Sequence, residues 1–213
     1  MAPKTGKLLQ RVGKQGRNQM LFDFGLDPKD MDNDSMVESK IQEIDDRFNL
    51  VMMQESFSES LVLLKEELCW DLDDVTNFKL NGRKEGVKKT LSNETRSKLR
   101  DFLRADYKLY NHFKEKLKSK IESFGREKMH EEVAKLESRN EEITRACSVN
   151  SVENQKLRSS QKWWGANIIG YTTSNSSSED CLLMTMSELA YIERIRTKQR
   201  ELAEKIISHR NQL

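Results

Sequence analysis

The chain has 213 residues, of which 36% are hydrophobic, 34% charged and 7% aromatic. Its 37 basic and 35 acidic residues leave a net charge of +2, which argues against a dedicated nucleic-acid binder because such proteins carry a strongly basic surface. No run approaches the roughly 18 consecutive apolar residues of a membrane span. With only 9 Gly and 2 Pro in the chain, helices are expected to dominate over a β-sandwich.

The amino-terminal half predicts helices that alternate with short strands. Residues 1–19 are basic and lack the apolar stretch of a signal peptide, so they are expected to be disordered. Helices are expected over about 35–48 and over 55–70. The short apolar run at 49–54 predicts a buried strand, which forms half of an α/β unit with the helix after it, and residues 75–80 predict a second short strand. The apolar stripe of that helix is Phe57, Leu61, Leu64 and Leu68.

The carboxy-terminal half predicts long helices and one polar interruption. Ser92 or Asn93 is expected to cap one long helix or two consecutive helices that stop at Gly125. Apolar residues at spacings of three and four predict another helix up to about residue 147. Residues 148–180 are rich in Ser and Asn and predict a loop. Thr185 and Glu188 form a capping box that opens a last, highly charged helix.

These patterns divide the chain into four expected segments. A basic, disordered segment occupies 1–19 and an α/β region occupies 20–147. A loop region with the apolar island WWGANIIGY occupies 148–184, and a charged terminal helix occupies 185–213.

The three cysteines, Cys69, Cys147 and Cys181, contain no C-x-x-C pair and have no His at metal-ligand spacing, so no metal site is expected. Cys69 is expected to be a core thiol. A pair with one free thiol requires an oxidising compartment. The pairing itself stays open at this point. Three N-x-[ST] sequons, at Asn33, Asn93 and Asn175, give weak support for the secretory pathway.

Two groups of charged residues are candidates for a site. Glu55 and Glu59 are four residues apart at a predicted strand-to-helix junction, where they either act as N-terminal helix charges or belong to a site. The loop NGRKEGVKKT is the best anion candidate because its glycines and backbone amides suit phosphate, and the alternative is a solvated loop. The cations of this loop are Arg83, Lys84, Lys88 and Lys89. These residues alone do not identify a reaction.

Four longer strings indicate a family. They are FDFGLD (Phe22–Asp27), IQEIDDRFNLVMMQESFSESLVLLKEELCWDLDDVTNFKLNGR (Ile41–Arg83), DYKLYNHFKEKLKSKIESFGREKMHEEV (Asp106–Val133) and IIGY (Ile168–Tyr171). In this order and spacing they resemble the carboxy-terminal half of the galactose-3-O-sulfotransferase family, over about residues 20–171. The resemblance implies an α/β fold. The chain would be the helix-rich, carboxy-terminal part of a P-loop-like sulfotransferase domain, with the parallel sheet largely missing.

The resemblance also implies an enzyme. Family members transfer sulfate from 3′-phosphoadenylyl sulfate, as co-substrate, to the 3-hydroxyl of galactose on glycolipids such as galactosylceramide or on glycoprotein glycans. They are Golgi membrane proteins with a lumenal catalytic domain, and neither a metal nor a nucleic acid takes part. By position, Arg83, Lys84, Lys88 and Lys89 would face the donor phosphates. Glu55 and Glu59 match family positions and would orient donor or acceptor groups.

The chain also departs from the family pattern. Neither the Lys-Thr-rich donor loop nor the 3′-phosphate element is recognisable, and PKTGK at Pro3–Lys7 has the wrong flanks for the first of them. The catalytic base and a membrane anchor are therefore expected upstream of this chain. The isolated chain is expected to bind donor weakly and not to turn over. The alternative function is a non-catalytic helical interaction module built from the charged helices at 126–147 and 186–209.

Overall fold

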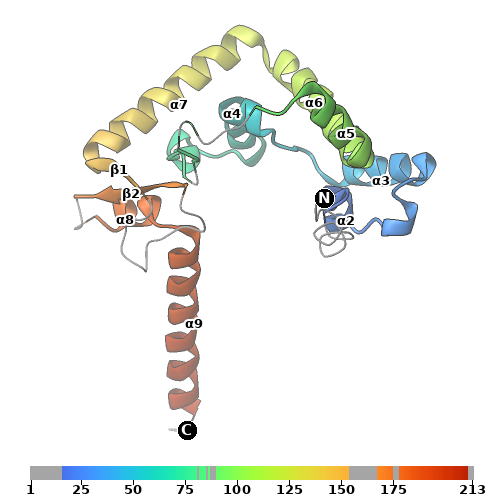
Figure 1. The fold of residues 1–213 in the computed structure, drawn as a ribbon. Coiled ribbons are helices and arrows are strands. Elements are labelled where there is room, and N and C mark those ends of the chain that lie inside the picture. Colours follow the sequence, from blue (N-terminus) through green and yellow to red (C-terminus); the bar gives the residue numbers. More distant parts are fainter. Residues whose placement is uncertain are drawn as a thin grey trace, which may run out of the picture. The chain divides into compact units, whose positions relative to one another are not determined.

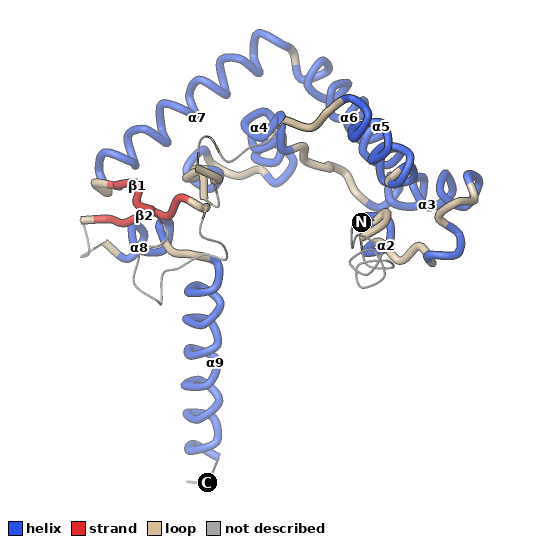
Figure 2. The backbone as a smooth tube through the Cα atoms, in the orientation of Figure 1, coloured by secondary structure: helices blue, strands red, loops and turns tan. Residues whose placement is uncertain are grey.

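The structure is a computed structural model that describes residues 16–80, 82–84, 86, 90–153, 167–174 and 178–210. Within these residues the chain is mostly helical, with one two-stranded antiparallel sheet (Figures 1 and 2). The expected dominance of helices is confirmed. The helices are α2 (Gln19–Asp23), α3 (Asp34–Arg47), α4 (Phe57–Leu68), α5 (Asn93–Phe102), α6 (Arg104–Phe124), α7 (Arg126–Ala146), α8 (Glu179–Thr185) and α9 (Glu188–Arg210). Short 3₁₀ turns lie at Pro28–Asp30, Gln54–Ser56 and Leu72–Val75.

The chain divides into two compact units, and helix α7 runs from one into the other. The first unit takes residues 1–71 and 90–134, and the second takes 72–89 and 135–213. The four segments expected from the sequence stay a prediction. No helix in the described parts of the chain combines the length and the apolar content that crossing a membrane requires.

The core of the first unit is formed by α3, α4 and α6. The side chain of Asn33 caps α3 by accepting a hydrogen bond from the Ser35 amide at 3.1 Å, and Gly125 with φ +97° ends α6. The apolar periodicity of α3 is confirmed by its buried residues. The large apolar side chains that the three helices bury are Val37, Ile41, Ile44, Leu61, Val62, Leu63, Leu109, Phe113 and Leu117.

The predicted apolar stripe of α4 is only partly correct. Phe57 and Leu68, at the ends of that stripe, are exposed, whereas Leu61, Val62 and Leu63 in the middle are buried. A helix that is apolar on several faces does not indicate from its sequence which face its neighbours cover. Cys69 is also exposed rather than in the core, because it follows the last turn of α4 in a left-handed conformation with φ +53°.

Both predicted strands of the first half are wrong. Residues 49–53 have no regular structure, and Val75 closes a 3₁₀ turn that residues 76–80 follow without strand pairing. A strand needs a neighbour for its amides and carbonyls, and the described residues provide none there. The buried Met53 amide instead donates a hydrogen bond to the Ser60 hydroxyl of α4 at 3.2 Å.

The choice between one long helix and two consecutive helices is resolved in favour of two. The Ser92 hydroxyl accepts a hydrogen bond from the Thr95 amide at 3.2 Å and caps α5, which confirms one of the two expected caps. Leu103 then separates α5 from α6.

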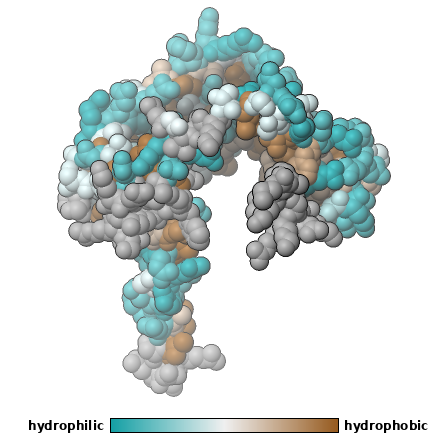
Figure 3. Space-filling view, viewed as in Figure 1, coloured by the Kyte–Doolittle hydropathy of each residue, from teal (hydrophilic) through white to brown (hydrophobic). Residues whose placement is uncertain are grey.

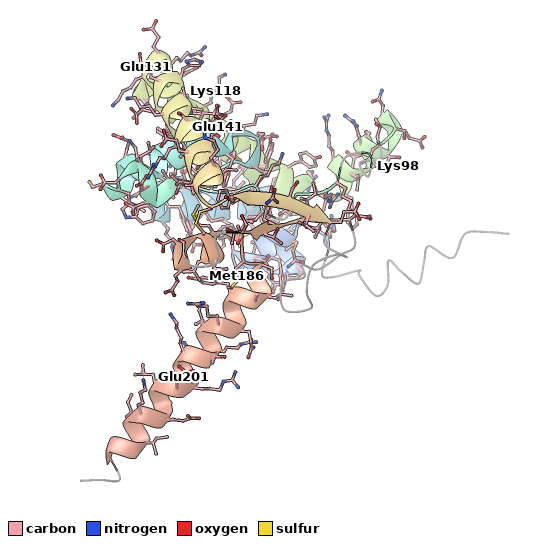
Figure 4. The ribbon with its side chains drawn as sticks, turned by 90° about the vertical axis from the view of Figure 1, so that its left-hand side faces the viewer. Lys98, Lys118, Glu131, Glu141, Met186 and Glu201 are labelled. Atoms are coloured by element: carbon pink, nitrogen blue, oxygen red, sulfur yellow. A yellow bond between two sulfur atoms is a disulfide. The ribbon has the colours of Figure 1, made fainter. Side chains whose placement is uncertain are left out.

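The second unit contains the sheet. Strands β1 (Val149–Glu153) and β2 (Ile169–Thr173) pair antiparallel, with Val149 opposite Thr173 and Glu153 opposite Ile169. The prediction of a loop over 148–180 is therefore wrong at these strands and at the start of α8. A disulfide joins Cys147, after α7, to Cys181 in α8 (Figure 4).

The predicted capping box at the start of α9 is wrong, because its first residue, Thr185, does not cap this helix. Thr185 is the last residue of α8, where its hydroxyl donates to the Cys181 carbonyl at 2.9 Å. The buried Ser187 caps α9 instead, with its hydroxyl 3.4 Å from the Ala190 amide. The last helix itself is confirmed.

An ion pair between α4 and α7 leads to a first testable prediction. Lys65 Nζ lies 2.8 Å from Glu132 Oε2, with 14% and 15% of the two side chains exposed, and this hydrogen bond raises the pKa of Lys65. Changing Glu132→Gln is expected to lower the free energy of unfolding by about 1–3 kcal/mol, because the half-buried ammonium group then keeps only the more exposed Glu66, at 3.1 Å, as a charged partner. Urea unfolding measures the change.

The matched control is Glu94→Gln. Glu94 pairs with Lys98 at 2.6 Å, but both side chains are more than 70% exposed. This change is expected to cost at most about 0.5 kcal/mol. Equal losses in the two variants would contradict the assignment of a stabilising role to the Lys65 pair.

Candidate functional site

The basic segment Gly82–Lys84 is attached to the sheet of the second unit. The Ile169 amide donates to the Gly82 carbonyl at 2.8 Å, and the Lys84 amide donates to the Asn167 carbonyl at 2.9 Å. Arg83 thereby forms an antiparallel bridge with Ile168, just before β2 begins. This pairing fixes the backbone from which the predicted cations extend.

The structure gives Arg83 and Lys84 different surroundings. The Arg83 side chain is exposed and has no hydrogen-bond or ion-pair partner among the described residues. Lys84 is half-buried, and its Nζ lies 3.3 Å from Glu153 Oε2 at the end of β1. Lys88 and Lys89 lie outside the described residues. Arg83 is therefore free to bind an external anion, whereas a carboxylate already compensates part of the Lys84 charge.

A cavity of about 360 Å³ lies in the same unit, next to the segment that leads into Gly82. Its lining residues come from three parts of the chain: Asn77, Phe78, Lys79, Thr144, Val149, Ser151 and Tyr171. Helix α7 holds this segment in place. Its Arg139 donates two hydrogen bonds to Asp73, at 2.7 and 3.0 Å, and its Asn140 side chain accepts one from the Asn77 amide at 2.9 Å.

Tyr171 links the cavity to the sheet. Its hydroxyl donates to the Lys79 carbonyl at 3.0 Å, and its ring centroid lies 6.3 Å from that of Phe78. Burial raises the pKa of Tyr171, so the phenol stays protonated near neutral pH and acts as a hydrogen-bond donor rather than a base. The cavity combines an aromatic wall with amide and hydroxyl groups, which suits a polar ring such as a sugar.

The two predicted carboxylates lie in the first unit, and only one of them belongs to a helix. Glu55 lies in the 3₁₀ turn before α4, is exposed and accepts a hydrogen bond from the Tyr110 hydroxyl of α6. Glu59 lies in the first turn of α4 and is half-buried. Glu59 has no hydrogen-bond or ion-pair partner within the described residues. The two residues therefore do not share one face of a helix.

Glu59 borders a second cavity of about 330 Å³, where α4 meets the end of α6 and the start of α7. The other lining residues are Lys118, Ile121, Glu122, Arg126, Met129, His130 and Val133, and Lys118 is labelled in Figure 4. Arg126 already pairs with Glu122 at 2.6 Å. The unpaired carboxylate of Glu59 is thus the acceptor in this cavity that is available to a hydroxyl or amine of a ligand.

Sequence reasoning named Glu59 and Arg83 but did not predict the side chains around them. Tyr171 and Tyr110 both fall inside strings that carry the family resemblance, IIGY and DYKLYNHF, and that was the signal that could have found them. No group of three or more His, Cys, Asp or Glu side chains able to hold a metal ion occurs in the part of the chain that the structure describes. A metal-free site stays a prediction.

Comparison with known proteins matches the chain to one family profile and to several curated proteins. The family profile described as Galactose-3-O-sulfotransferase matches residues 11–199. Galactosylceramide sulfotransferase of Bos taurus is 37% identical over 188 residues, which cover 83% of this chain and 44% of that protein. Galactosylceramide sulfotransferase of Homo sapiens is 35% identical over 187 residues, which again cover 83% of this chain and 44% of that protein.

A second kind of relative is similar to nearly the same extent. Galactose-3-O-sulfotransferase 2 of Homo sapiens is 34% identical over 192 residues, which cover 84% of this chain and 48% of that protein. The chain thus spans about half the length of the curated relatives it matches. No solved structure matches it significantly.

Proposed function

The chain belongs to the galactose-3-O-sulfotransferase family, and we propose on this premise that the protein transfers sulfate to the 3-hydroxyl of galactose. The donor is 3′-phosphoadenylyl sulfate, and the acceptor is a galactose-terminated glycolipid, such as galactosylceramide, or a glycan. The observation that supports this proposal most is the sequence similarity to such enzymes over more than four-fifths of the chain. We also propose that the described helices belong to a P-loop-like domain.

The reaction sets the roles that side chains have to fill. The galactose oxygen forms a bond to sulfur while the bond from sulfur to the donor phosphate breaks, and a base takes the hydroxyl proton. The phosphates of the donor need cations, which also stabilise the charge that develops on the leaving group. No residue of this chain is assigned as the base.

In this proposal Arg83 and Lys84, with Lys88 and Lys89, hold the donor phosphates. The support is the exposed and unpaired guanidinium of Arg83 on a backbone that the sheet fixes. An Arg fork binds phosphate with two parallel hydrogen bonds, which gives orientation as well as affinity. Glu55 and Glu59 orient acceptor groups, and the open carboxylate of Glu59 beside its cavity supports this role for Glu59.

The proposed location is the lumenal side of the Golgi membrane. The disulfide between Cys147 and Cys181 supports an oxidising compartment, since such bonds are rare where thiols are kept reduced.

Binding of the donor product tests the phosphate role. Nuclear magnetic resonance titration of the chain with adenosine 3′,5′-bisphosphate is expected to shift the amide signals of Gly82, Arg83, Lys84 and Ile169. Arg83→Ala is expected to weaken the affinity about tenfold or more, because a hydrogen bond to a charged group contributes about 1.5–3 kcal/mol. Arg145→Ala is the control. Arg145 is also an exposed arginine, but its guanidinium already has a carboxylate partner, with Nη1 at 3.7 Å from Glu141 Oε2. An affinity that Arg83→Ala leaves unchanged would refute the phosphate role.

Transfer of labelled sulfate tests the reaction itself. The chain alone is expected to show no turnover, since it lacks a recognisable donor loop. A chimera in which residues 11–199 replace the matching part of the Bos taurus enzyme is expected to sulfate the 3-hydroxyl of a galactosyl acceptor. Assays with galactosylceramide and with a galactose-terminated glycan separate the two acceptor classes. A folded chimera that binds donor but sulfates neither acceptor would count against the proposed function.

A further inference from the structure

Helix α9 carries an exposed apolar stripe. Ile192, Ile195, Leu202 and Ile206, with Gln199 between them, follow at spacings of three and four residues. Ile192 is half-buried, but Ile195 is 42% exposed, Leu202 59% and Ile206 60%, so the described chain leaves the stripe uncovered from Ile195 onward. Figure 3 shows apolar side chains along this helix among hydrophilic ones. Long aliphatic side chains exposed in a row mark a surface that another molecule covers.

The spacing favours a helix as that molecule. Spacings that alternate between three and four give a mean period of 3.5 residues, which keeps the stripe facing a partner helix along a coiled-coil seam. Gln199 lies in the middle of the stripe. A polar residue at one seam position is tolerated between helices, where it sets register and partner, but it opposes insertion of the same face into lipid.

The charges of α9 are sorted around the stripe. The charged residues at the seam-flanking positions are all basic: Arg196, Lys198 and Lys205. Glu201 and Glu204 lie on the opposite side of the helix, and Glu201 is labelled in Figure 4. Glu193 also lies away from the stripe, where it pairs with Arg200 at 2.8 Å and with the flanking Arg196 at 3.6 Å. Lys198 has no ion-pair partner within the described residues.

We propose that the stripe of α9 docks an amphipathic helix of a partner protein whose flanking positions are acidic. Such a helix buries Ile195, Leu202 and Ile206 and brings carboxylates to Arg196 and Lys198. A second copy of this chain fits poorly, because basic flanks would face basic flanks. The family match ends at residue 199, so Ile195, Arg196 and Lys198 lie within the matched part and Leu202 and Ile206 lie beyond it. No residue of this surface is among those proposed to hold the donor or the acceptor.

The test uses the full chain and a designed peptide of three heptads with Leu at the seam and Glu at the flanking positions. Fluorescence anisotropy is expected to show saturable binding of this peptide. A peptide with Lys in place of each Glu is expected to bind at least about tenfold more weakly. Replacing Leu202→Asp is expected to abolish binding, while Glu201→Gln on the opposite side leaves it unchanged. Circular dichroism verifies that each variant keeps its helix content.

A charge exchange separates docking from a merely structural role of the helix. The double variant Arg196→Glu with Lys198→Glu is expected to prefer the Lys-flanked peptide, which a loss of folding cannot produce. Equal binding of the two peptides, or no binding of either, overturns the proposal. So does self-association of the chain in sedimentation that Leu202→Asp removes, or binding to vesicles of phosphatidylserine and phosphatidylcholine without binding to the acidic peptide.

Discussion

Reduction of the disulfide between Cys147 and Cys181 is expected to lower the free energy of unfolding of the second unit by about 3–4 kcal/mol. The bond closes a loop across 34 residues, and most of its stabilisation comes from limiting the unfolded chain. Domains of this size have a total stability of only about 5–15 kcal/mol, so the change is a large fraction of it. Thermal unfolding with and without reductant measures the shift.

The packing around the bond explains why its loss should affect the whole unit. Cys147 and Cys181 are about 4% and 5% exposed, at the end of α7 and in α8. The Thr173 hydroxyl at the end of β2 donates to the Cys147 carbonyl. The disulfide therefore joins two helices at the point where both strands of the sheet meet them.

Variants separate this bond from the third thiol. Cys147→Ser together with Cys181→Ser should reproduce the effect of reductant and should make the chain insensitive to it. Cys69→Ser is the matched control, because the exposed Cys69 thiol makes no disulfide and its change should cost less than about 0.5 kcal/mol. An intact mass with three alkylated thiols in the oxidised chain, or equal sensitivity of the double variant to reductant, would contradict the assignment.

The sequence predicts the helices well because their signal is local. In α3 the repeat of Val37, Ile41 and Ile44 marks the buried face, and in α6 the apolar repeat stops at the glycine that ends the helix. Each pattern lies within a few turns of chain, where the 3.6-residue period dictates which side chains share a face.

The strands fail because their signal depends on partners far away in the chain. The apolar run at 49–54 resembles a buried strand, yet no strand of the described residues lies beside it, and the Met53 amide binds Ser60 instead. Strand β1, by contrast, has the polar sequence VNSVE and forms only because Ile169–Thr173 pairs with it. Pairing between distant segments leaves little trace in either strand alone.

In the candidate site, too, the sequence predicts what depends on neighbouring residues and misses what depends on distant ones. Arg83 and Lys84 stand out because basic residues beside glycines are a local pattern. The cavity next to them joins Asn77, Thr144 and Tyr171, which only the fold brings together. The pairing of Cys147 with Cys181 was open for the same reason, since three cysteines allow three pairs and their spacing selects none.

A second large effect is expected in the first unit, where Asp106→Ala should lower the free energy of unfolding by about 3 kcal/mol. The two carboxylate oxygens of Asp106 accept hydrogen bonds from the Met20 and Leu21 amides, each at 3.0 Å. The Asp106 amide in turn donates to the Asn18 side chain at 3.2 Å. Asp106 is 6% exposed and Leu21 is fully buried, so water cannot easily replace the lost acceptor.

These bonds attach the short helix α2 to the first turn of α6. A helix of five residues is too short to be stable by itself, so the acceptor at its amino-terminal end decides whether it forms. The amides of Met20 and Leu21 should therefore lose their protection from hydrogen exchange in Asp106→Ala, while the amides within α4 keep theirs. This local readout distinguishes release of α2 from a general loss of stability.

Asp106→Asn should fall between the wild type and the alanine variant, because an amide keeps one acceptor oxygen for two donors. Asp101→Ala is the matched control, since Asp101 lies exposed in α5, and the change should stay within about 0.5 kcal/mol. If Asp106→Asn were as stable as the wild type, one hydrogen bond would suffice to hold α2. If both Asp106 variants left the exchange of Met20 and Leu21 unchanged, the carboxylate would not hold α2, and the packing of Leu21 alone would have to do so.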